Sequence, residues 1–240
     1  RELVKKNYIV IDRLSGASIG SVVALCYLTN SLDLYIEKYE ALREKWRENI
    51  KLSIINELID DICNNLDDDT FLEIKTNKLF VTYYCLDTKK QIIKCDFTDK
   101  DDLRLSIIKS CYLPYIVDND IGYKCEEQYF IDGGHPYIFH NREKTGLNKI
   151  LYISINQLKN IPKMITTKNE NNLYGRVLRG ILDCYEFFLN QNNGSYKETE
   201  LCSYVNEWKT TKYIGLYIKQ FSILIFVYLI SYIHILINKL

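Results

Sequence analysis

The chain has 240 residues, and its 31 lysine and arginine residues balance 31 aspartate and glutamate residues. This length suits one α/β domain with a tail and allows a sizeable hydrophobic core. The balanced charge, with no basic stripe of interleaved aromatic residues, argues against nucleic acid as a partner.

The first predicted elements are a strand and a helix joined by a glycine-containing turn. The β-branched run Tyr8–Ile11 predicts the strand, and the apolar run Ser21–Leu28 predicts a buried helix. Between them, Gly16, Ser18 and Gly20 form a G-x-S-x-G pattern. At a strand-to-helix junction this pattern is typical of a nucleophile elbow, in which the glycines permit a tight turn that exposes the serine oxygen. The alternative from the pattern alone is an ordinary turn.

An elbow of this kind places Ser18 at the N-terminus of a helix. Unpaired N–H groups and the helix dipole favour developing negative charge at such a position. The N–H group of Ile19, which follows the serine, is therefore the predicted donor to an oxyanion.

The middle of the chain alternates predicted helices and strands. Helices are predicted over Tyr35–Ile50, Ile54–Cys63 and Asp101–Cys111, and a strand hairpin over Leu79–Leu86 and Gln91–Phe97. The alternation indicates an α/β sandwich with a mainly parallel sheet, whose site residues lie at the carboxyl ends of strands. The acidic run Asp67–Asp69 lacks the spaced oxygens of a calcium loop and is typical of a helix cap or turn.

A second motif follows the apolar strand Tyr129–Ile131, which leads directly into Asp132, Gly133 and Gly134. Asp-Gly is also a common way to end a strand, so this turn has a purely structural interpretation. A serine nucleophile needs a base, however, and a carboxylate held rigidly at a strand end suits that role.

Together these motifs resemble the patatin-like phospholipases over about residues 8–156. Ser110–Pro114 is similar to the family's small-residue-to-proline segment, and Leu151–Ile155 to the strand that follows the aspartate. The family uses a Ser–Asp dyad without histidine, so the resemblance implies Ser18 as the nucleophile and Asp132 as the base.

The resemblance also implies a fold and a reaction. The expected fold is a patatin-like three-layer α/β/α sandwich, in which Gly16 and Gly20 shape the elbow and Gly133 and Gly134 support the base. The expected reaction is hydrolysis of a lipid carboxylic ester, a phospholipid or acylglycerol, through an acyl-enzyme, with no metal or organic cofactor. A membrane surface is the implied partner, and the implied location is intracellular and membrane-associated.

One feature of the family has no counterpart in this sequence. Family members begin with a strand and a glycine-rich loop that builds the oxyanion hole, and nothing in Arg1–Asn7 resembles it. Since the only methionine is Met164, we expect either a fragment that lacks its first strand or a degenerate homologue. Ile19 is then the one visible oxyanion donor, and losing the others costs about 3 kcal/mol, or about a hundredfold or more in rate.

Two other functions are compatible with these motifs. An α/β-hydrolase triad would recruit His135 or His140, which follow Asp132 in chain order, although His135 comes only three residues after it. A non-catalytic lipid- or membrane-binding protein would keep the fold without the oxyanion loop.

The C-terminal part differs in composition. Leu173–Leu189 predicts a helix with an apolar face, and Phe221–Ile237 is an uncharged run of 17 residues. That length is at the lower limit for a bilayer span, about 17 to 25 residues, so we expect a membrane segment or a buried or interfacial helix. The predicted domains are an acyl hydrolase domain at 1–210 and an apolar tail at 211–240.

The eight cysteines are dispersed without a C-x-x-C pair, and several occupy apolar segments. This favours buried thiols in a reducing compartment over a disulfide framework. The three histidines lack the spacing of metal ligands, so no metal site is predicted.

Overall fold

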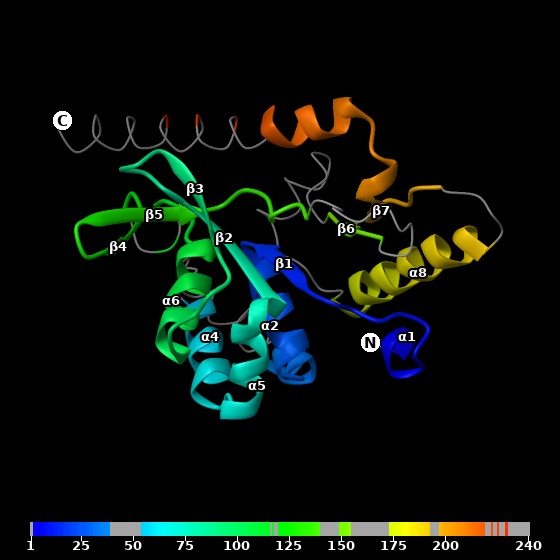
Figure 1. Ribbon diagram of the computed structural model, residues 1–240, viewed down its shortest axis with the longest axis horizontal. Coiled ribbons are helices and arrows are strands. Elements are labelled where there is room, and N and C mark those ends of the chain that lie inside the picture. The colour runs from blue at the N-terminus through cyan, green and yellow to red at the C-terminus, as the bar shows by residue number, and fades with distance from the viewer. Residues whose placement is uncertain are drawn as a thin grey trace. The chain divides into compact units, whose positions relative to one another are not determined.

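The computed structural model describes residues 2–38, 54–115, 117, 120–139, 149–154, 173–192, 197–218, 222, 225 and 229. The chain divides into two compact units: Arg1–Tyr137 with Leu216–Leu240, and Ile138–Gly215. Figure 1 shows the helices and strands of both.

The first unit is a mixed α/β structure built on a five-stranded sheet. Its strands are β1 (Leu14–Ala17), β2 (Leu79–Cys85), β3 (Lys90–Lys94), β4 (Tyr123–Cys125) and β5 (Gln128–Asp132). β1 and β2 are parallel, whereas β2 with β3, β2 with β5, and β4 with β5 are antiparallel. A mainly parallel sheet is therefore not found among the described strands. The pairs β2–β3 and β4–β5 are hairpins, whose short connections force the strands to run antiparallel, and β5 also runs antiparallel to β2.

Strand β2 is the centre of this sheet, and two strands share one of its edges. β3 occupies one edge of β2 along residues 81–85. β1 pairs with residues 79–82 and β5 with residues 83–85. Since a strand has only two edges, β1 and β5 must both lie on the edge opposite β3.

The ends of β1 and β5 meet on this shared edge. Ala17, the last residue of β1, faces Thr82, and Asp132, the last residue of β5, faces Tyr83. Because the two strands approach from opposite directions, their carboxyl ends reach adjacent positions of β2. β1 cannot continue straight on, since β5 already occupies the next position.

Helices cover one face of the sheet. They are α2 (Ile19–Leu28), α4 (Ile54–Asn64), α5 (Asp68–Glu73) and α6 (Lys100–Cys111), with a short π-helical segment, η1, at Ile74–Lys78. Among the described side chains, the short helix α1 (Glu2–Lys5) contributes none to the hydrophobic core between these helices and the sheet. Alternate residues of β2, from Leu79 to Cys85, are buried in one cluster with apolar side chains of α2, α4 and α6. This alternation is what a strand with one face against a core requires.

Two local predictions have different outcomes here. The strand predicted at Tyr8–Ile11 is wrong: the strand before the elbow is β1, and the side chains of Tyr8 and Val10 are 74% and 86% exposed. β-branched residues favour strands only where a neighbouring strand pairs with them. The helix cap is confirmed, because Asp67 caps α5 by accepting a hydrogen bond from the Thr70 N–H at 2.8 Å.

The second unit contains a helix and a two-stranded sheet. Its elements are β6 (Leu151–Ile153), α8 (Leu173–Asn192), β7 (Cys202–Tyr204) and a 3-10 turn, η4, at Val205–Glu207. The strand predicted at Leu151–Ile155 is present as β6, but it pairs antiparallel with β7 rather than joining the five-stranded sheet. The helix predicted over Leu173–Leu189 is confirmed as α8.

Several predictions concern residues outside the described part. Residues 32–38 are helical, but most of the helix predicted over Tyr35–Ile50 lies outside the described residues, as does most of Phe221–Ile237. Within the part of the chain that the structure describes, no helix is long and apolar enough to cross a bilayer. The membrane-segment prediction for the tail thus stays a prediction.

Candidate active site

Ser18 is the single residue between strand β1 and helix α2. Its backbone has φ 55° and ψ −139°, which is outside the regions that non-glycine residues normally occupy. The need for this turn follows from the sheet, because the end of β5 blocks the straight path of β1. The predicted strand-to-helix turn at Ser18 is confirmed, and the Ser18 side chain is half-buried.

The two glycines of the motif have different roles. A Cβ atom on Gly16 would lie 2.5 Å from the Cα and N atoms of Ser21, in the first turn of α2. Only glycine therefore allows β1 and α2 to approach this closely. A Cβ atom on Gly20 would meet no atom within 4 Å, so packing does not require glycine there.

Hydrogen bonds hold the peptide groups on both sides of Ser18. The Ser18 N–H donates to Ser110 Oγ at 2.9 Å, and that hydroxyl donates to the Thr82 carbonyl at 2.7 Å. The Ser18 carbonyl accepts from the N–H of Ser21 at 2.8 Å and from its Oγ at 2.6 Å. The Ile19 N–H has no acceptor among the described residues and remains available at the helix N-terminus.

Asp132 is held in place by its backbone and by the glycine turn. Its N–H donates to the Tyr112 carbonyl at 2.9 Å, and its Oδ1 accepts from the Gly134 N–H at 2.8 Å. Gly134 has φ 75°, which favours glycine. A Cβ atom on Gly133 would lie 2.5 Å from the Thr82 carbonyl oxygen. Both glycines are thus needed for a turn that orients a half-buried carboxyl group.

His135 follows this turn and is fixed through its backbone. Its N–H donates to the Gly133 carbonyl at 2.9 Å, and its own carbonyl accepts from Thr82 Oγ1 at 2.8 Å and from Gln91 Nε2 at 3.1 Å. Its ring Nδ1 lies 3.0 Å from the Pro136 carbonyl oxygen. The turn role predicted for His135 is confirmed, and His140 lies outside the described residues.

Cys111 lies beside these groups and was not a sequence candidate. Its Sγ is 3.8 Å from Ser21 Oγ. Burial raises the pKa of Cys111 to about 12, and the negative charge of Asp132 acts in the same direction. The thiol therefore stays protonated near neutral pH and is a poor nucleophile.

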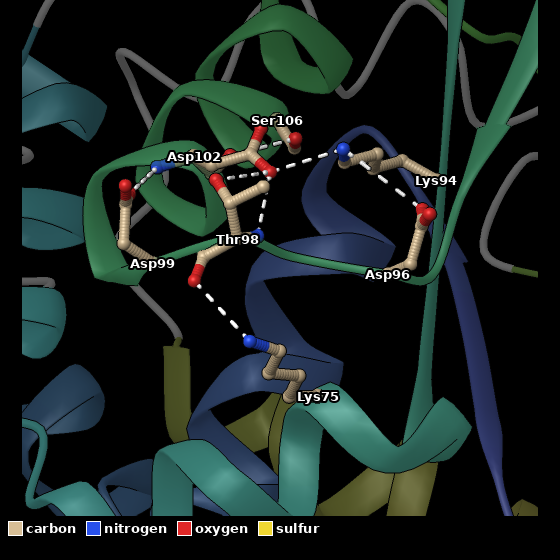
Figure 2. Close-up of polar contacts among 7 residues, drawn as sticks. All are labelled: Lys75, Lys94, Asp96, Thr98, Asp99, Asp102 and Ser106. Carbon is tan, nitrogen blue, oxygen red and sulfur yellow. Dashed lines mark hydrogen bonds and ion pairs between the residues drawn. The ribbon is translucent and has the colours of Figure 1, made fainter.

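A second polar cluster lies at the other end of α6, and Figure 2 shows its side chains. Asp99 caps the helix by accepting from the Asp102 N–H at 2.8 Å. The Asp102 carboxylate accepts from the Thr98 N–H at 3.0 Å and forms an ion pair with Lys94, also at 3.0 Å. Burial raises the pKa of Asp102, but the Thr98 hydrogen bond and Lys94 outweigh it and hold that pKa below the ordinary value. These contacts show that the cluster caps the N-terminus of α6, which is a structural role.

The structure thus brings the backbones of Ser18 and Asp132 close together, and it adds three residues that were not predicted as site residues. These residues are Ser110, Cys111 and Thr82. The sequence signal for Ser110 and Cys111 was the small-residue segment before Pro114, whereas Thr82 had none beyond its predicted strand. Among the described residues, no cluster of histidine, cysteine or acidic side chains could hold a metal ion. Comparison with known proteins finds no family model and no curated protein that matches the chain.

Proposed function

We propose that the chain is a serine acyl hydrolase of the patatin-like type, with Ser18 as nucleophile and Asp132 as base. The observation that carries this proposal is the strained turn at Ser18, placed where the strand ending in Asp132 meets β1 on one edge of β2. A strained backbone conformation persists only where the surrounding structure enforces it, and such conformations cluster at functional sites. The three-layer α/β/α arrangement of the patatin-like fold belongs to the same proposal, with the mixed sheet described above in place of a mainly parallel one.

The reaction would proceed in two displacement steps. Ser18 Oγ attacks the ester carbonyl carbon while Asp132 accepts its proton, and the Ile19 N–H donates to the oxyanion. The tetrahedral intermediate collapses, and the leaving alcohol takes the proton from Asp132. Asp132 then removes a proton from water, which attacks the acyl carbonyl. The bond to Ser18 Oγ breaks as Asp132 returns the proton to that oxygen, so the carboxylic acid leaves and both residues regain their starting state.

The substrate class in this proposal is a lipid carboxylic ester. It rests on the resemblance of Gly16–Gly20 and Asp132–Gly134 to the patatin-like motifs. A membrane surface as partner and an intracellular, membrane-associated location belong to the same proposal, as does turnover without a metal or organic cofactor.

A fluorophosphonate probe tests the assignment directly. We expect peptide mapping to find the phosphonate on Ser18, and Ser18→Ala to abolish labelling. Asp132→Asn should slow labelling by about 10²- to 10⁴-fold, the usual contribution of a general base. Asp99→Asn is the matched control, because it neutralises a helix-capping carboxylate of the same unit. Labelling that survives Ser18→Ala would remove Ser18 from the mechanism.

The same assay separates a dyad from a triad. His135→Gln should leave most of the labelling rate and of the esterase activity intact, because the described hydrogen bonds fix His135 mainly through its backbone. A collapse of activity in His135→Gln or His140→Gln, with the circular dichroism spectrum unchanged, would support the triad instead.

A further inference from the structure

We propose that Ser110 is a positioning residue for the nucleophile: its hydroxyl holds the strained backbone of Ser18 and so fixes the direction of Ser18 Oγ. The inference rests on the proposed function, since it gives Ser110 a role in that reaction. Ser110 does not touch the substrate in this role and acts only through Ser18.

The hydroxyl of Ser110 sits between the elbow and the central strand. It accepts from the Ser18 N–H at 2.9 Å and donates to the Thr82 carbonyl at 2.7 Å. Thr82 is the residue that faces Ala17, immediately before Ser18. The hydroxyl therefore connects the two strands at the first position where β1 has turned away from β2.

This position requires a group that donates and accepts at once. Ser110 and Thr82 are both fully buried, with 0% of their surface exposed, so water cannot replace the hydroxyl. An alanine at position 110 would leave the Ser18 N–H and the Thr82 carbonyl without these partners. A threonine keeps the hydroxyl, and a cysteine keeps the size with a much weaker donor and acceptor.

Loss of this hydroxyl should act on the elbow before it acts on the fold. The Ser18 conformation persists only where its surroundings determine it, and its N–H has Ser110 as acceptor. The hydrogen bond that holds the Asp132 backbone does not involve Ser110, because the Asp132 N–H donates to the Tyr112 carbonyl. We therefore expect the base to stay in place while the nucleophile loses its alignment.

Three variants test the inference against a matched control. Ser110→Ala should lower the rate of fluorophosphonate labelling at Ser18 and the kcat for a soluble short-chain ester by roughly tenfold to a hundredfold, with KM little changed. Ser110→Thr should recover most of the rate, and Ser110→Cys should fall between. Ser106→Ala is the control, because Ser106 is equally buried on α6 but donates to the Asp102 carbonyl within the helix.

Amide hydrogen exchange at Ser18 gives a readout that does not depend on turnover. We expect the Ser18 amide to be protected in the wild type and in Ser110→Thr, and to exchange faster in Ser110→Ala or Ser110→Cys. If Ser110→Ala does not fold, the labelling and amide exchange rates of Ser110→Cys test the inference in its place. Wild-type labelling and exchange rates in the variant that folds would overturn the inference alone, whereas a wild type that is never labelled at Ser18 would overturn the proposed function with it.

Discussion

The two ends of α6 stabilise the same sheet by different means. At its N-terminal end the contacts are charged and partly exposed, with side-chain exposures of 23% for Lys94 and 27% for Asp102 (Figure 2). At its C-terminal end Ser110 and Cys111 are buried, and the contacts are uncharged hydrogen bonds. The N-terminal end of α6 is thus anchored by groups that respond to pH and salt, whereas the elbow at Ser18 is held at the C-terminal end by groups that do not.

The two ends should also differ in how much a substitution costs. Partly exposed ion pairs contribute about 0.2 to 1 kcal/mol and weaken as salt is added. A buried donor or acceptor left unsatisfied costs about 1 to 3 kcal/mol. Substitutions near the C-terminal end of α6 should therefore be the more damaging ones.

The largest expected effect is at the elbow, beside the C-terminal end of α6. Gly16→Ala would place a Cβ 2.5 Å from backbone atoms of Ser21, so we expect a loss of about 3 kcal/mol or more in the free energy of unfolding. Gly20→Ala has open space and should be neutral or stabilising by about 0.5 to 1 kcal/mol, because alanine favours a helix. Urea denaturation of both variants measures this contrast, and equal losses would contradict it.

A smaller effect is expected at the charged end. Asp99→Ala removes the side-chain cap of α6 and should lower the free energy of unfolding by about 1 kcal/mol. Asp99→Asn should retain most of that stability, because asparagine is also a good cap. Both variants should react with a fluorophosphonate at the wild-type rate. A slowed reaction would mean that the two ends of α6 are coupled.

The smallest expected effect is a pH dependence from Asp102. Its folded pKa is lowered, so its contribution is present above the unfolded pKa of about 3.9 and is lost as the pH falls through the folded value. We expect about 0.5 kcal/mol of the wild-type stability to disappear in this window, and Asp102→Asn to lack that part of the decline. Denaturation midpoints between pH 7 and pH 3, compared at low and high salt, test this expectation. An identical decline in the variant would show that other groups account for it.

Most of the features that the sequence predicts correctly depend on local motifs. The hairpin of β2 and β3, the helix α6 and the turn at Ser18 depend on residues that are close in sequence, and each prediction is confirmed. The strand at Tyr8–Ile11 failed because β-branched residues do not show whether a partner strand lies beside them. Leu14 has that partner in Leu79, far along the chain.

The arrangement around the site could not be predicted for the same reason. No local pattern shows that β1 and β5 share an edge of β2, because that depends on β3 occupying the other edge. Ser110 was visible only as a small residue before Pro114, and its contact with Ser18 joins two segments that are distant in sequence. The difference between Gly16 and Gly20 likewise appears only when the packing around each is known.

The shared edge of β2 also has a consequence for how the chain folds. The elbow faces the end of β5 only after two long-range strand pairings, β1 with β2 and β5 with β2, have both formed. Pairings between distant segments form slowly, because the loop between them must close first. A collapsed chain with its hairpins and helices in place would still lack the assembled site. Under the proposed function, Ser18 would therefore become reactive during refolding only when the second of these strand pairings has formed. Its reactivity would follow that step and not the initial collapse of the chain.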